Sequence, residues 1–160
     1  MKKGTKRVFS LTTLLKLFLL TSISAGNPVN TVKEGDNGDS KVTVINMTND
    51  MFKQLVYNYE KNKEWKYEGT KPAIIDFYAT WCPPCRELSP LVEQIAHQYS
   101  GKIVVYKIDT DKEKLLSQML GISGLPTLLF IPLKGKPQAS MGFIPKEAIV
   151  KTINDVLHIK

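Results

Sequence analysis

Two cysteines separated by two prolines are the residues of this 160-residue chain best suited to covalent chemistry. Cys82 and Cys85 are its only cysteines, and they follow a strand-like run and open a long helical pattern. A helix N-terminus offers partial positive charge and unpaired N–H groups, which favour a thiolate over a thiol. We therefore expect Cys82 to be a reachable nucleophile. Cys85, one helical turn further and nearer the core, would resolve a mixed disulfide by attacking Cys82.

Two other uses of the cysteine pair compete with redox exchange. A zinc site normally needs four ligands, and the only histidines, His97 and His158, fall on separate helical patterns far away in the sequence. A purely structural disulfide would close so small a loop that it would stabilise the fold little. Redox exchange is therefore the favoured interpretation, with no metal and with no cofactor beyond the cysteine pair itself.

The surrounding sequence predicts the elements that must position this pair. Strand-like runs rich in β-branched residues lie at 41–45, 73–78, 103–108, 127–131 and, more weakly, 138–142. Apolar residues at helical spacing lie between and after them, at 51–59, 88–99, 115–120 and 149–157. This alternation predicts an α/β fold with a central mixed sheet of about five strands flanked by about four helices. The last two strands should pair antiparallel, because their connection is too short for a helical crossover.

Several motifs agree, in order and spacing, with those of one known family. They are the run DFYATWCPPC at 76–85, Pro90 in the following helical pattern, Gly124-Leu125-Pro126-Thr127 before the fourth strand, and Gly142. From residue 41 to the C-terminus the chain thus resembles the thioredoxin family. The resemblance implies a thioredoxin fold in which Pro126 follows a cis peptide bond and its loop lies against the cysteines.

The resemblance also implies a substrate-binding surface around the cysteines. A cis bend at Pro126 would leave the backbone of Leu125 free to pair with an extended substrate strand. Trp81 and Leu125 would supply apolar surface beside the sulfur atoms. The expected members of this surface are Trp81, Pro83, Pro84, Gly124, Leu125, Pro126 and Gly142.

Asp76 and Lys107 are the expected acid–base residues. By strand alternation Asp76 points to the same side as Tyr78 and opposite Phe77, within a run too apolar to solvate a charge. Burial should raise its pKa and let it accept and return the proton of Cys85. Lys107 matches the family position that pairs with this acid. Two simpler interpretations stay open, namely a buried acid without catalytic use and an edge lysine with its ammonium group in water.

The dipeptide between the cysteines bears on the direction of exchange. Pro83 and Pro84 lack backbone N–H groups, and neither supplies an imidazole, so few donors can stabilise a Cys82 thiolate. A poorly stabilised thiolate favours giving electrons away, which predicts a thiol-disulfide oxidoreductase that reduces disulfides. The family usually has Gly-Pro here, so the potential itself stays undetermined. The alternatives are an interchange protein of the cytochrome-maturation type and a non-catalytic peptide-binding module.

The N-terminal sequence predicts export. Residues 1–25 combine a basic start, an apolar stretch and small residues, as a signal peptide does. An uncleaved anchor is the alternative, although the apolar stretch is short and contains Lys16. We expect residues 26–40 to be a polar flexible linker and residues 41–160 to be the thioredoxin-like domain. The predicted location is periplasmic or otherwise extracytoplasmic.

The charge distribution narrows the class of partner. The chain has 22 basic and 15 acidic residues, a formal net charge of +7. Five of the basic residues and none of the acidic ones lie in the first 25 positions, so the remainder is nearly balanced and nucleic-acid binding has little support. The expected partners are disulfide-containing exported proteins and an unidentified electron donor, with a membrane thiol-disulfide carrier as one candidate. We expect a monomer.

Overall fold

A computed structural model describes residues 44–160 of the chain. The predicted signal peptide and linker lie outside the described residues. The elements are β1 (Ile45–Asn46), α1 (Asn49–Leu55), β2 (Ala73–Tyr78), α2 (Pro83–Gln98), β3 (Val104–Asp109), α3 (Lys114–Met119), β4 (Thr127–Ile131), β5 (Gln138–Met141) and α4 (Lys146–Thr152), which continues into a π-helical turn, Ile153–Leu157. The predicted order of strands and helices is confirmed. None of the helices within 44–160 is both long and apolar enough to cross a membrane.

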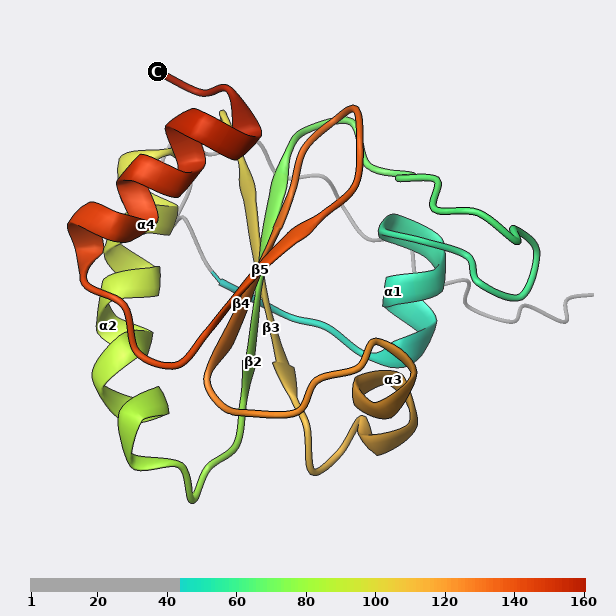
Figure 1. Cartoon of the computed structure of the whole chain (residues 1–160), viewed down its shortest axis with the longest axis horizontal. Coiled ribbons are helices and arrows are strands. Elements are labelled where there is room, and N and C mark those ends of the chain that lie inside the picture. The colour runs from blue at the N-terminus through green and yellow to red at the C-terminus, as the bar shows by residue number, and fades with distance from the viewer. Residues whose placement is uncertain (1–43) are drawn as a thin grey trace, which may run out of the picture. The chain divides into compact units, whose positions relative to one another are not determined.

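The five strands form one mixed sheet in the order β1-β3-β2-β4-β5. β3 lies between β1 and β2 and is parallel to both, whereas β4 is antiparallel to β2 and to β5. Figure 1 shows the sheet edge-on, with α2 and α4 covering one face and α1 and α3 the other. The predicted mixed sheet with an antiparallel final pair is confirmed, and the architecture is a thioredoxin fold.

Alternation along β2 distributes its side chains between two cores. Ile74 belongs to the cluster beneath α2 and α4, which includes Leu88 of α2. Ile75 and Phe77 belong to the cluster on the side of α1 and α3. Because side chains two residues apart share a face of a strand, Asp76 lies with Ile74 on the face that α2 covers. The strand therefore presents a carboxyl group beneath the helix that begins at the cysteines.

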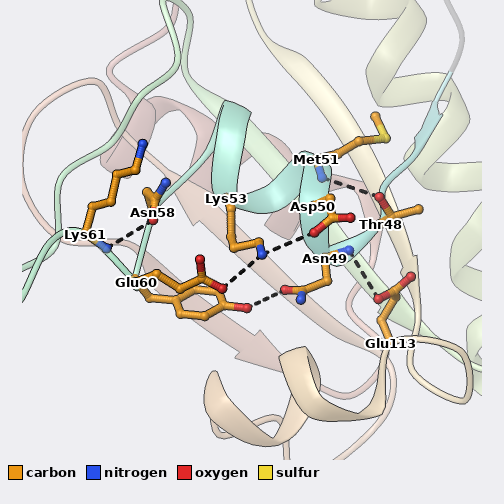
Figure 2. Close-up of polar contacts among 10 residues, drawn as sticks. Thr48, Asn49, Asp50, Met51, Lys53, Asn58, Glu60, Lys61 and Glu113 are labelled. Atoms are coloured by element: carbon orange, nitrogen blue, oxygen red, sulfur yellow. Dashed lines mark hydrogen bonds and ion pairs between the residues drawn. The ribbon is translucent and has the colours of Figure 1, made fainter.

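The loop between β3 and α3 is held against the start of α1. Thr48 caps this helix, since its Oγ1 accepts the N–H of Met51 at 3.3 Å. Glu113, the residue before α3, accepts the N–H of Asn49 through Oε2 at 3.1 Å (Figure 2). Two segments far apart in the sequence are joined by this contact. The contact restrains the loop that carries Asp111.

Candidate active site

Cys82 and Cys85 form a disulfide at the N-terminus of α2. The S–S distance is 2.06 Å and the Cα atoms are 5.3 Å apart. Cys82 is the N-cap residue, and its Sγ accepts the backbone N–H of Cys85 at 3.3 Å. Pro83 and Pro84 occupy the first two helical positions and have no N–H to offer. The cysteine pair thus lies at the start of a helix, as the sequence predicted, with one backbone donor on the sulfur of Cys82.

Both cysteines are buried in this disulfide form. Cys82 is 3 % exposed and Cys85 2 %, and they cluster with Ala79 while Tyr78 and Leu125 pack against them. The expectation that Cys82 is distinctly more accessible than its partner is therefore wrong for the oxidised protein. The cause is the packing of neighbouring side chains around the bridge. A thiol that reduces this disulfide must therefore reach a sulfur atom that is almost fully covered.

The loop before β4 forms one wall beside the disulfide. The Leu125–Pro126 peptide bond is cis, and Leu125 packs against the cysteines. The Pro126 carbonyl accepts the N–H of Gly142 at 2.7 Å, which ties this loop to the end of β5. Within 44–160, no hydrogen bond uses the backbone N–H or C=O of Leu125. These groups are available to pair with an extended peptide, although the structure contains none.

Large apolar side chains lie exposed near the disulfide and near the loop before β4. Trp81 is 65 % exposed, and its Nε1 donates to Asp111 Oδ2 at 2.8 Å. Met141 and Phe143, which flank Gly142, are 61 % and 45 % exposed. Met141 also lies over Gly124, where an added Cβ would be 2.7 Å from its Sδ. A side chain at this position would displace the end of that flexible, exposed methionine.

The sequence analysis missed Asp111, Met141 and Phe143. Asp111 follows the end of β3, and the ends of parallel strands β2 and β3 meet at the edge of the sheet where α2 begins. That placement was the available signal for Asp111. For Met141 and Phe143 the signal was a pair of large apolar residues around the glycine singled out beside the active site.

Asp76 is buried and incompletely hydrogen-bonded. It is 3 % exposed, and its Oδ1 has no hydrogen-bond partner within the part of the chain that the structure describes. Burial raises the pKa of this carboxyl group to about 7, and the positive charge of Lys107 opposes the rise without cancelling it. An acid with a pKa near neutrality can both take up and release a proton at physiological pH.

Lys107 is the register partner of Asp76 on β3, yet the two charged groups form no direct ion pair. The ion pairs found within 44–160 do not include Lys107. Its Nζ instead lies 5.9 Å from the centre of the Tyr78 ring. Burying an ion pair has a desolvation cost that offsets much of the attraction between the two charges. A ring face beside solvent attracts the ammonium group with a smaller desolvation cost. The two residues are adjacent, but the expected direct pairing is absent.

No group of three or more histidine, cysteine or acidic residues within 44–160 is arranged to hold a metal ion. The described site consists of a disulfide at a helix N-terminus, a loop with a cis proline beside it, and a buried acid on the strand beneath that helix. These features together define a thiol-disulfide oxidoreductase.

Comparison with known proteins identifies the family. The family model for thioredoxin matches residues 41–155. A thioredoxin of Borreliella burgdorferi is 47% identical over 111 residues, which cover 69% of this chain and 95% of that protein. A thioredoxin of Pyropia yezoensis is 34% identical over 113 residues, covering 71% and 96%. The chain belongs to the thioredoxin family.

Solved structures agree with this assignment. Chloroplastic thioredoxin z is 30% identical and covers 72% of this chain and 96% of its own, with a TM-score of 0.60. A thioredoxin of Malassezia sympodialis, also 30% identical, covers 68% and 87%, with a TM-score of 0.56. Each of them is similar to this chain in fold as well as in sequence.

Proposed function

We propose that this thioredoxin-family oxidoreductase works as a reductant of disulfides in exported proteins, outside the cytoplasm. The observation that carries the direction of exchange is that, within residues 44–160, the Cys82 sulfur has one backbone donor, the N–H of Cys85. A thiolate with few donors is stabilised less, so the reduced enzyme gives its electrons away more readily. The location rests on the signal-like composition of residues 1–25.

The catalytic cycle is a balanced dithiol–disulfide exchange. The Cys82 thiolate attacks one sulfur of the substrate disulfide, forming a mixed disulfide and releasing the other substrate sulfur as a thiolate. Cys85 gives its proton to Asp76 and attacks Cys82, which releases the second substrate sulfur. The enzyme is left as the disulfide seen in the structure, and two electrons have passed to the substrate.

The cycle needs a donor of two electrons, which a thiol-disulfide carrier in the membrane would supply. The chain acts as a monomer in this proposal. Cys85→Ser, expressed in the native compartment, would hold substrates as mixed disulfides on Cys82 and so identify them. The cytochrome-maturation alternative is less favoured, because only β3 and α3 lie between α2 and Pro126, which leaves little room for an additional segment.

The equilibrium potential of the cysteine pair against glutathione tests the direction. We expect a value near that of reducing thioredoxins, about −270 mV. A value near that of strong oxidases, about −120 mV, would contradict the proposal while leaving the oxidoreductase class intact.

Replacing Pro84 with alanine should make the pair more oxidising. An N-cap side chain accepts from the second or third helical residue, and Pro84 holds the second position. The new N–H would stabilise the thiolate and raise the potential by about 30 mV, which corresponds to roughly 1.4 kcal/mol. Pro83→Ala is the matched control, since the N–H of the first helical residue is not aimed at the cap. Equal shifts in both variants would refute the proposed dependence on donors.

A further inference from the structure

Tyr78 shares one face of the sheet with Asp76 and Lys107. Asp76 and Tyr78 lie two residues apart on β2, and their register partners on β3 are Lys107 and Asp109. In a parallel ladder, paired residues share a face, so these four side chains project to the same side of the sheet. The side of the sheet that carries Lys107 therefore also carries the carboxylates of Asp76 and Asp109 and the ring of Tyr78.

The ammonium group lies over the ring. Its Nζ is 5.9 Å from the ring centre, and Lys107 takes part in none of the ion pairs found within 44–160. Both Tyr78 and Lys107 line a surface hollow of about 300 Å³, and Asp76 is not part of that lining. The ammonium group of Lys107 therefore lies at the surface beside solvent, whereas the carboxyl group of Asp76 is buried.

The same ring also reaches the redox centre. Tyr78 packs against the cluster formed by Ala79, Cys82 and Cys85. Tyr78 thus contacts both the disulfide cluster and the lysine, so a change in its side chain alters the surroundings of both. An aromatic residue here can hold a cation by the face of its ring while its apolar body covers the sulfur atoms.

We propose that Tyr78 is a positioning residue for proton transfer: its ring holds the ammonium group of Lys107 away from Asp76, so that the buried carboxyl group can take up and release a proton during exchange. The inference rests on the proposed role of Asp76. An opposite charge in direct contact would hold the carboxyl group ionised and unable to return a proton. Tyr78 prevents that contact without removing the lysine.

The other charged and titratable groups near Asp76 do not account for the protonation of its carboxyl group. On the neighbouring strand β4 the residue opposite Asp76 is the apolar Leu128, and Cys85 at the start of α2 is held in the disulfide and does not titrate in the oxidised protein. On β3 and the loop after it, Asp109 and Lys112 pair with each other at 3.5 Å. Lys107 is the one charged group that alters the pKa of Asp76 in the described structure, where it lowers it against the larger effect of burial.

Titration of the Asp76 carboxyl carbon by NMR in the oxidised protein tests the inference. In Tyr78→Leu, Lys107 is freed to approach, and the pKa of Asp76 should fall by about one to three pH units. In Tyr78→Phe the ring is kept and the pKa should stay within a few tenths of the wild-type value. Tyr78→Met is measured beside Tyr78→Leu, because its flexible side chain fills more of the space and serves as the test if the leucine variant does not fold. The pKa of Asp76 should show the same fall in this variant.

The decisive control repeats the change in a Lys107→Met background. If Tyr78 acts through the lysine, its replacement by leucine or methionine no longer lowers the pKa there. An equal fall in both backgrounds would mean that water enters the site, and would overturn the inference. An unchanged or higher pKa in Tyr78→Leu and Tyr78→Met would overturn it as well. Because the carboxyl group is observed directly, these outcomes are independent of whether the wild-type enzyme reduces its substrates.

Discussion

Cys82→Ser should lose catalysed insulin reduction entirely, with the rate falling roughly 10³-fold or more to that of the added reductant alone. A serine hydroxyl is a far weaker nucleophile than a thiolate. Cys82 accepts the one backbone N–H available at the start of α2, so no other side chain can take its place. Turbidity of the precipitating insulin B chain measures the rate.

Cys85→Ser is the matched control for this experiment. It keeps the nucleophile and removes the resolving thiol, so turnover should stop while a covalent adduct with insulin accumulates on Cys82. Intact-protein mass spectrometry detects that adduct. If Cys82→Ser and the wild type reduce insulin equally, the chain is a peptide-binding module and its disulfide is inert.

The second large effect is a loss of stability with rising pH that originates at Asp76. Its pKa is about 7 in the folded protein and 3.8 in the unfolded chain, so the folded state binds more protons between these values. The contribution of this group to stability is complete below pH 4 and falls by about 4 kcal/mol as the pH rises from there to above 7. Urea unfolding of the oxidised protein at a series of pH values measures the free energy.

Asp76→Asn isolates that effect. The amide fills nearly the same space and does not ionise, so the variant should lack the fall between pH 4 and pH 8. The difference in unfolding free energy between variant and wild type should therefore grow by about 4 kcal/mol across this range. Parallel curves for the two proteins would show that Asp76 is not held protonated by burial.

The sequence predicted most of the scaffold because each strand and helix has its own periodicity. The bounds of β2 and β4 match the predicted runs, since both strands are apolar on both faces and end at polar or turn-forming residues. The first strand was expected at 41–45, and within the described residues it is Ile45–Asn46. β1 is an edge strand, and its paired length is determined by β3 rather than by its own pattern.

The parts of the site that escaped prediction depend on contacts between distant segments. Trp81 and Asp111 are 30 positions apart and meet because β2 and β3 end at the same edge of the sheet. The low exposure of Cys82 results from the joint packing of Ala79, Tyr78 and Leu125 around the disulfide, and of these only Leu125 was expected there from the family resemblance. Lys107 was placed beside Asp76 from the family resemblance, but its preference for the ring of Tyr78 depends on side-chain conformations.

Alkylation of the reduced, folded protein with iodoacetamide across pH, followed by peptide mass mapping, tests the central claim most directly. The account predicts that Cys82 is modified first and that its reactivity rises at a lower pH than that of an ordinary thiol, because the helix N-terminus favours the thiolate. Cys85 should stay largely unmodified at neutral pH. A Cys82 that resists the reagent until the protein unfolds, or that reacts after Cys85, would contradict the assignment of the attacking sulfur.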